Sequence, residues 1–158
     1  MATAYVALGA NLGDPVATVE AAFAALAGLP ETSVAATSAL YRTAPVGYAD
    51  QPEFINAAAR LETALEPEAL LDALLGIEQA FGRIRAERNG PRTLDLDVLL
   101  YADRVLATPH LTLPHPRLHL RAFVLYPLAD LAPDLVIPGR GTLAAWLPAV
   151  ANQGIVRL

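Results

Sequence analysis

The chain has 158 residues, of which 54% are hydrophobic and 17% are charged, and it contains no cysteine. This length and composition predict a single domain over residues 1–158 with a sizeable core, and they exclude disulfide or thiol chemistry. The formal net charge of -5 argues against nucleic acid or an acidic membrane as a partner. Because no apolar run is long enough to span a bilayer, we expect a soluble cytoplasmic protein.

The first third of the chain alternates between strand and helix patterns. Residues 3–8 form an apolar run that predicts a buried strand. Asp14 followed by Pro15 is typical of a helix start, and apolar residues then recur at helical spacing as far as Leu26. A second strand is predicted over residues 34–42, and the loop that follows, up to Pro52, is long enough to carry binding residues.

A third strand is predicted over residues 53–63, with its small and branched apolar residues on the core face. Phe54 and Asn56 fall together on the opposite face. An aromatic ring beside an amide suits a flat heterocycle that both stacks and forms hydrogen bonds, although such pairs are also common on strands without any binding role. Pro67 then opens a second helix, which Gly82 closes.

The fourth strand carries two acidic residues. Leu94, Leu96, Val98 and Leu100 alternate with Asp95, Asp97, Leu99 and Tyr101, so the two carboxylates share one face. Two carboxylates at this spacing suit Mg²⁺, which takes phosphate oxygens and water as its other ligands. A solvated edge strand is the alternative interpretation.

Basic residues cluster around these aspartates. All eleven are arginines, and seven of them lie between positions 83 and 121. The guanidinium group suits bidentate contacts with phosphate, and the polar segment 83–92 is a candidate phosphate loop. His115 lies among the three histidines of residues 110–119, and we consider a phosphate or hydrogen-bond contact and a structural role equally.

The order strand, helix, strand, strand, helix, strand predicts an α+β, ferredoxin-like βαββαβ core with C-terminal additions. In this fold both main helices cover one face of an antiparallel sheet and leave the other face for ligands. A further helix is predicted over residues 122–131, and Thr142 is expected to cap a last short helix that ends at Val150.

The chain resembles the 6-hydroxymethyl-7,8-dihydropterin pyrophosphokinase family of the folate pathway. The resemblance rests on Gly-Pro-Arg-Thr-Leu-Asp-Leu-Asp at 90–97, with Tyr-Arg-Thr at 41–43 and Asp-Gln-Pro at 50–52 before it, and Leu-Pro-His at 113–115 and Arg-Ala-Phe at 121–123 after it. It extends from the first strand to about Ile137. Members transfer the β,γ-pyrophosphoryl group of ATP to the pterin hydroxymethyl oxygen and release AMP.

The resemblance also implies roles for individual residues. Asp95 and Asp97 are implied as catalytic residues and as ligands of two Mg²⁺ ions, and Arg83 and Arg92 as catalytic residues that contact the phosphates. The residues implied for pterin binding are Thr43, Ala44, Pro45, Val46, Phe54, Asn56 and Phe123. The residues implied for nucleotide binding are Glu78, Arg85, Arg88, Arg92, Val98, Thr112, His115 and Arg121. We expect a monomer that acts by direct transfer.

The chain departs from the family pattern in its loop, which is short between Arg85 and Gly90 and has Asn89 where a tryptophan often occurs. Pro116 also stands where an aromatic residue occurs in the family. Two other classes share the predicted topology: an RNA-binding module, which the acidic charge and missing aromatic pattern disfavour, and a non-catalytic small-molecule sensor.

Overall fold

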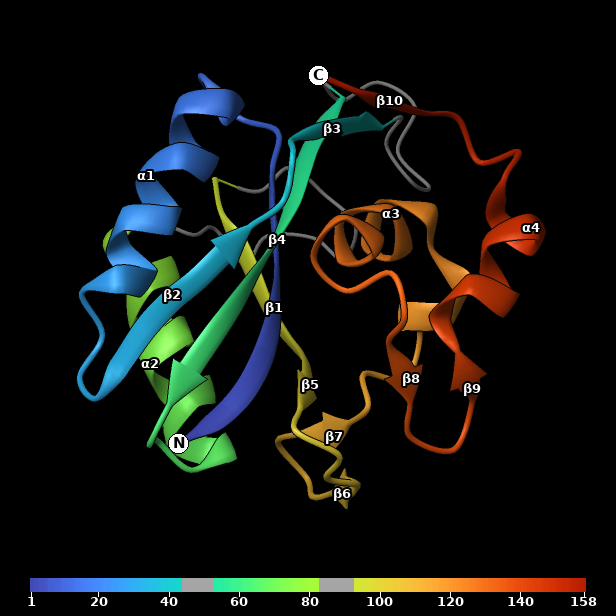
Figure 1. Ribbon diagram of the computed structural model, residues 1–158. Coiled ribbons are helices and arrows are strands. Elements are labelled where there is room, and N and C mark those ends of the chain that lie inside the picture. The colour runs from blue at the N-terminus through green and yellow to red at the C-terminus, as the bar shows by residue number, and fades with distance from the viewer. Residues whose placement is uncertain (44–52, 83–92) are drawn as a thin grey trace.

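The structure, a computed structural model, describes residues 1–43, 53–82 and 93–158 (Figure 1). The core elements are β1 (Ala2–Ala10), α1 (Pro15–Ala27), β2 (Thr32–Thr37), β3 (Tyr41–Thr43), β4 (Phe54–Thr63), α2 (Pro67–Ala80) and β5 (Asp95–Tyr101). The elements that follow are β6 (Leu106–Ala107), β7 (Thr112–Leu113), η1 (Leu118–Leu120), α3 (Ala122–Leu131), β8 (Val136–Ile137), β9 (Gly141–Thr142), η2 (Leu143–Trp146), α4 (Leu147–Val150) and β10 (Ile155–Arg157).

An antiparallel sheet forms the centre of the molecule, with strand order β10-β3-β4-β1-β5. β2 also pairs with β4, farther along the edge that β3 occupies. Helices α1 and α2 lie on one side of this sheet, and α3 and α4 lie on the other side (Figure 1). The sheet is therefore the middle layer of a mixed α/β fold.

The first core lies between the sheet and the helices α1 and α2, as predicted. Asp14 caps α1, because its Oδ1 accepts a hydrogen bond of 3.1 Å from the backbone N–H of Ala17. Leu26 of α1 and Leu74 of α2 are fully buried against Val6 and Leu61 of the sheet. Burial of each such leucine or valine side chain stabilises the fold by about 1.5–3 kcal/mol.

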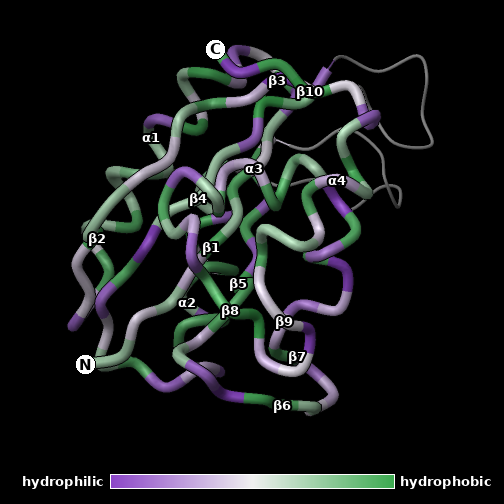
Figure 2. Tube along the Cα trace, turned by 45° about the vertical axis from the view of Figure 1, so that its right-hand side comes forward, coloured by the Kyte–Doolittle hydropathy of each residue, from purple (hydrophilic) through white to green (hydrophobic). Residues whose placement is uncertain are grey.

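The prediction that the opposite face stays free for ligands is wrong over much of that face. Tyr5 and Leu99 form a second core there with Leu125 and Leu128 of α3. The physical reason is that this face carries large apolar side chains that need cover from water. Figure 2 shows hydrophobic residues in the middle of the molecule, along β1 and β5, and a mixture of hydrophilic and hydrophobic residues at its periphery.

The end of β5 departs from the predicted alternation. The register between β1 and β5 shifts between Tyr5 and Val6, so Leu100 pairs with Tyr5 while Val98 pairs with Val6. One extra residue in β5 reverses the face of everything after it. Leu100 therefore joins the second core and Tyr101 the first, the opposite of the sequence prediction.

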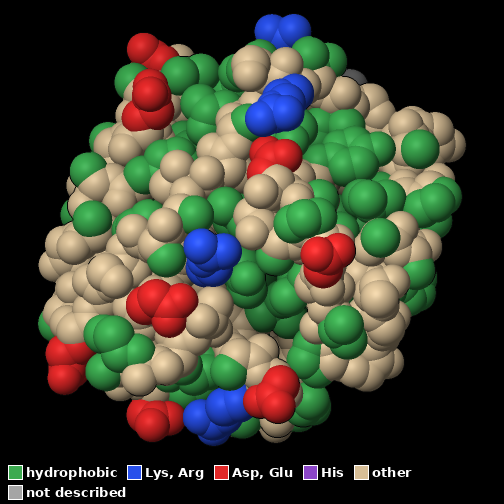
Figure 3. All heavy atoms as spheres, viewed as in Figure 1, with side chains coloured by type: hydrophobic (Ala, Val, Ile, Leu, Met, Phe, Trp, Pro, Cys, Tyr) green, Lys and Arg blue, Asp and Glu red, His purple; other side chains and the backbone are tan. Residues whose placement is uncertain are grey.

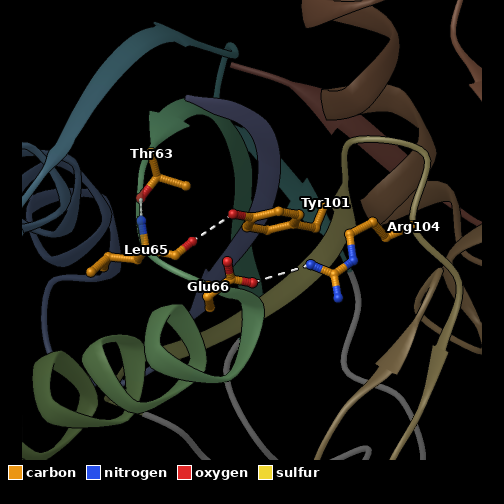
Figure 4. A network of polar contacts seen from close by, with 5 residues as sticks. All are labelled: Thr63, Leu65, Glu66, Tyr101 and Arg104. Atoms are coloured by element: carbon orange, nitrogen blue, oxygen red, sulfur yellow. Dashed lines mark hydrogen bonds and ion pairs between the residues drawn. The ribbon is translucent and has the colours of Figure 1, made fainter.

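Tyr101 is fixed on its new face by the start of α2 (Figure 4). Its hydroxyl donates a hydrogen bond to the carbonyl of Leu65, and Arg104 pairs with Glu66 at 3.2 Å. Burial raises the pKa of the Tyr101 hydroxyl above its usual value, and the nearby Glu66 carboxylate adds to this shift. These two contacts connect the end of β5 with the residues just before α2.

The second strand predicted over residues 34–42 is divided into β2 and β3. Ser38 lies at the break, where its hydroxyl accepts a hydrogen bond of 2.8 Å from the backbone N–H of Ala58. Because the serine side chain takes the place of a backbone carbonyl, the ladder along β4 is interrupted.

The helix predicted over residues 122–131 is present as α3. Thr142 does precede the last helical segment, but its side chain forms no capping hydrogen bond, and the segment is a 3₁₀ turn followed by the single turn α4.

Among the described residues, no helix is long and apolar enough to cross a membrane. On the face drawn in Figure 3, acidic and basic side chains of the described residues are interspersed and do not gather by sign.

Candidate active site

Three neighbouring strands bring an amide and two carboxylates to one face of the sheet. Gly9 of β1 is paired with Asn56 of β4 on one side and with Asp95 of β5 on the other. In the next row, Ala7 lies between Ala58 and Asp97. Residues paired directly across a sheet share a face, so Asn56, Asp95 and Asp97 lie on the same surface.

Between these polar groups, β1 contributes only the small residues Gly9 and Ala7. A Cβ atom added at Gly9 would meet Asn56 Oδ1 at 3.0 Å, which is closer than ordinary van der Waals contact. Glycine at this position therefore leaves room beside the amide of Asn56.

Asn56 is held in one orientation. It is 6% exposed, and its Nδ2 donates a hydrogen bond of 2.8 Å to Oγ1 of Thr43. Oδ1 of the same amide therefore points toward Gly9 and the row of site residues. Phe54, half-buried, is paired with Thr43 and lies on the same face as Asn56.

Glu78 forms a hydrogen bond with the backbone between the two aspartates. This residue of α2 is 1% exposed, and its Oε2 accepts a hydrogen bond of 2.7 Å from the backbone N–H of Leu96. Leu96 lies between Asp95 and Asp97, and its own side chain points into the first core. The carboxylate of Glu78 thus holds the β5 backbone where the two aspartates emerge.

A pocket of about 250 Å³ opens beside Asp97. Val98, Thr112 and His115, all predicted to bind nucleotide, line it. The remaining lining residues are Leu71, Thr108, Pro109, His110, Leu111 and Pro116. The lining therefore combines apolar side chains with a carboxylate and two imidazoles, a combination that suits a ligand with an aromatic base and phosphates.

His115 is fixed by its backbone and its ring. Its backbone N–H donates a hydrogen bond of 2.9 Å to the carbonyl of Leu99, and its ring Nδ1 accepts a hydrogen bond of 3.2 Å from the backbone N–H of Arg117. Burial lowers the pKa of His115 to about 4, and the charges of Arg121, Arg140 and Arg117 add to this shift while Asp95 opposes it. At neutral pH the ring is therefore uncharged, with its proton on Nε2.

Arg121 carries a positive charge near both aspartates. Burial lowers its pKa, the charge of Arg117 adds to this effect, and Asp97 and Asp95 oppose it. Its guanidinium carbon lies 5.4 Å from the ring centre of Phe123, in the first turn of α3. A cation stacked on an aromatic ring keeps a fixed direction while its N–H groups remain available to an anion.

The two aspartates fit a site for Mg²⁺ in both number and chemistry. Both are only partly exposed and share one face, next to a pocket. Among the described residues, no group of three or more His, Cys, Asp or Glu could hold a metal ion. Mg²⁺ bound by one or two carboxylates takes its other ligands from phosphates and water, so this donor set suits a metal that arrives with a phosphate ligand.

Several residues predicted for the site lie outside the described residues. They are Ala44, Pro45, Val46, Arg83, Arg85, Arg88 and Arg92. Sequence reasoning missed Gly9, which lies between Asn56 and Asp95.

A family model described as 7,8-dihydro-6-hydroxymethylpterin-pyrophosphokinase (HPPK) matches residues 5–133. The 2-amino-4-hydroxy-6-hydroxymethyldihydropteridine pyrophosphokinase of Pseudomonas aeruginosa is 53% identical over 154 residues, which cover 98% of this chain and 95% of that protein. The protein of the same description from Haemophilus influenzae is 43% identical over 158 residues, which cover 100% of this chain and 99% of that protein.

Solved structures agree on the fold. A triple mutant of Plasmodium falciparum HPPK-DHPS, crystallised with STZ-DHP, matches with a TM-score of 0.76 at 15% identity. The match covers 96% of this chain but only 44% of that longer chain. The chain described here belongs to the 7,8-dihydro-6-hydroxymethylpterin-pyrophosphokinase family.

Proposed function

We propose that this chain transfers pyrophosphate from ATP to the hydroxymethyl group of 6-hydroxymethyl-7,8-dihydropterin and releases AMP, a step of tetrahydrofolate synthesis. The observation that carries the proposal is the row Asn56, Gly9 and Asp95 across β4, β1 and β5. This row joins a fixed amide to a pair of carboxylates, and the second carboxylate borders a pocket. Two substrates could therefore meet at the aspartates, one from each side.

The pterin is proposed to lie on the Asn56 side. A pterin ring carries neighbouring hydrogen-bond donors and acceptors at its edge, which match the carboxamide of Asn56. Phe54 and Phe123 supply aromatic surface for its faces, and Thr43 fixes the amide at 2.8 Å. Ala44, Pro45 and Val46 are proposed to contact its edge as well.

ATP is proposed to occupy the pocket beside Asp97. Val98 and Thr112 line this pocket, and its apolar side chains suit adenine. His115 offers Nε2–H and Arg121 offers its guanidinium to the phosphates. Glu78 is proposed to act here through the backbone of β5 that it holds, and Arg83, Arg85, Arg88 and Arg92 as further phosphate contacts.

Asp95 and Asp97 are proposed to hold two Mg²⁺ ions together with the triphosphate. When bound, Mg²⁺ neutralises charge on the phosphate oxygens and polarises the phosphorus that is attacked.

The proposed reaction is one direct displacement. The pterin hydroxymethyl oxygen forms a bond to the β-phosphorus of ATP, the bond from that phosphorus to the α,β-bridging oxygen breaks, and the hydroxyl proton is released. Such a transfer mainly requires positioning and charge stabilisation. Asn56 and the two phenylalanines orient the acceptor, while His115 and Arg121 stabilise charge on the transferred and leaving groups.

We also propose that the arrangement is a ferredoxin-like βαββαβ fold, and that residues 1–158 act as one monomeric domain in the cytoplasm. The strand order β3-β4-β1-β5 supports this fold, because each β–α–β unit then has one strand inserted between its two strands. Light scattering on a sizing column tests the monomer.

An AMP-release assay tests the proposed function. It compares ATP and Mg²⁺ with and without the pterin, for the wild type and for a variant with both Asp95→Ala and Asp97→Ala. We expect pterin-dependent AMP from the wild type and none above background from the folded variant. A folded wild type that binds the pterin but yields no AMP would instead indicate a small-molecule sensor.

A further inference from the structure

The segment after β8 contacts the site through Arg140. This residue lies in the turn between β8 and β9, which Gly139 and Gly141 form with φ angles of +74° and +80°. Its Nη1 donates a hydrogen bond of 2.8 Å to the backbone carbonyl of His115. The same nitrogen lies 3.0 Å from Nδ1 of His119, which must accept because arginine can only donate.

Arg140 is itself held in place. Nε1 of Trp146 donates a hydrogen bond of 2.9 Å to the carbonyl of Arg140, and the indole meets the ring of His119 edge-on, with ring centres 4.7 Å apart. The guanidinium is therefore held by the His115 carbonyl and the His119 ring, while Trp146 holds the backbone of Arg140. These contacts make Arg140 a fixed support for the backbone at His115.

A second side chain of the same C-terminal segment brackets Arg121. Oε1 of Gln153 accepts a hydrogen bond of 2.9 Å from the backbone N–H of Ala122, and its Nε2 donates one of 3.0 Å to the carbonyl of Leu120. One amide thus binds the backbone on both sides of Arg121. These bonds join the end of η1 to the start of α3, where no side chain of α3 caps the helix.

Both supported residues face the aspartates. His115 shares the pocket with Asp97, and Arg121 is close enough to Asp95 and Asp97 for their charges to act on it. Both supporting residues lie beyond residues 5–133, the part that the family model matches. The C-terminal segment therefore forms hydrogen bonds with the backbone at His115 and on both sides of Arg121, the two residues proposed to contact the phosphates.

We propose that Arg140 and Gln153 are positioning residues for nucleotide binding, which fix the backbone at His115 and Arg121 so that both side chains point toward the phosphates. The inference rests on the proposed function, because it takes the nucleotide side of the site from it. Neither residue touches substrate. The effect of Arg140 should be confined to the nucleotide side, since its side chain binds at His115 and His119, whereas Gln153 also holds the backbone next to Phe123, which is proposed to contact the pterin.

Calorimetric titration tests this inference without turnover. The full chain is titrated with a Mg²⁺ complex of a nonhydrolysable ATP analogue and, separately, with the pterin. Arg140→Met keeps the aliphatic stem but removes the donors, and Gln153→Leu removes both hydrogen bonds at similar volume. Arg104→Met is the matched control, since Arg104 lies just beyond the far end of β5, where its guanidinium forms an exposed ion pair with Glu66 and lies 5.9 Å from the ring centre of Tyr101.

We expect Kd for the nucleotide to rise about tenfold in Arg140→Met and several-fold in Gln153→Leu, since each loses one or two hydrogen bonds that fix a ligand-binding group. In Arg140→Met, Kd for the pterin should change less than about twofold, and Arg140→Lys, which can still donate to the His115 carbonyl, should recover part of the loss of nucleotide binding. Arg104→Met should bind both ligands like the wild type.

Unchanged nucleotide binding in both variants would overturn the inference, as would an equal loss for both ligands in Arg140→Met that follows the loss of thermal stability. The test is separate from that of the proposed function. If the wild type yields no pterin-dependent AMP, the proposed function fails, while the titrations still decide whether Arg140 and Gln153 position the nucleotide side.

Discussion

The carboxylate of Glu78 accepts a 2.7 Å hydrogen bond from the backbone N–H of Leu96, the residue that separates Asp95 from Asp97. Both partners are buried, with Glu78 1% and Leu96 4% exposed. A helix in the first core therefore fixes the strand whose other face carries Asp95 and Asp97. This contact links the stability of the fold to the geometry of the proposed metal site.

Replacing Glu78 tests that link. Glu78→Leu leaves the buried N–H of Leu96 without this acceptor, and we expect a loss of about 1–3 kcal/mol in the free energy of unfolding together with reduced turnover. Glu78→Gln keeps an acceptor oxygen and should recover much of both. Urea unfolding and the AMP assay measure the two effects. A Glu78→Leu protein as stable and active as the wild type would show that the contact is dispensable.

Gly9 is expected to act in pterin binding through its lack of a side chain. In Gly9→Ala the new Cβ meets Oδ1 of Asn56 at 3.0 Å, and the amide must shift. We expect KM for the pterin to rise about tenfold, with a smaller change in KM for ATP. Steady-state kinetics with each substrate varied in turn measure this difference.

Gly76→Ala is the control for this substitution. Gly76 lies in α2, where an added Cβ meets nothing within 4 Å. Alanine should stabilise this helix by about 0.5–1 kcal/mol and leave both KM values unchanged. Equal KM values for the pterin in Gly9→Ala and Gly76→Ala would show that Gly9 has no role in pterin binding.

Thr43 fixes the amide of Asn56, so Thr43→Val should impair recognition of the pterin. The substitution leaves the buried Nδ2 of Asn56 without its 2.8 Å acceptor. We expect a loss of about 1–2 kcal/mol in stability and a several-fold increase in Kd for the pterin. Thr43→Ser retains the hydroxyl and should bind the pterin nearly as the wild type does; calorimetry distinguishes the two. Identical binding by both variants would contradict the assigned role.

The buried ring of His115 predicts a specific loss of stability in acid. Its pKa falls from 6.5 in the unfolded chain to about 4 in the folded protein. Between these values the unfolded chain binds more protons, so stability is fully present above pH 6.5 and falls as the pH decreases toward 4.

Denaturant unfolding in EDTA, compared at pH 7.5 and pH 4.5, measures this contribution. The wild type should lose more stability on acidification than His115→Asn, which cannot titrate. If the two proteins lose the same amount, His115 is not held in its neutral form by the fold.

The sequence predicted those parts of the fold that depend on local patterns. Asp14 and Pro15 mark the start of α1 correctly, and α3 has the predicted bounds, because capping and periodicity act within a few residues. The face of Tyr101 was predicted wrongly. A bulge depends on how β5 pairs with β1, and the alternation within one strand does not contain that information.

The candidate site divides in the same way. Asp95, Asp97, Phe54 and Asn56 could be assigned to shared faces from alternation, and the register brings them together through Gly9. Arg140 and Gln153 could not be found from the sequence. They act through hydrogen bonds to backbone atoms 25 and 31 residues away, and backbone contacts leave no pattern of residue types.

The most direct test of the central claim is the mass of the pterin product in a reaction with equal ATP and pterin. The proposed function predicts a pterin that carries a diphosphate, formed in a 1:1 ratio with AMP. This product should require Mg²⁺ and be absent in the variant with Asp95→Ala and Asp97→Ala. A pterin monophosphate formed with ADP, or AMP and pyrophosphate formed without change in the pterin, would contradict it.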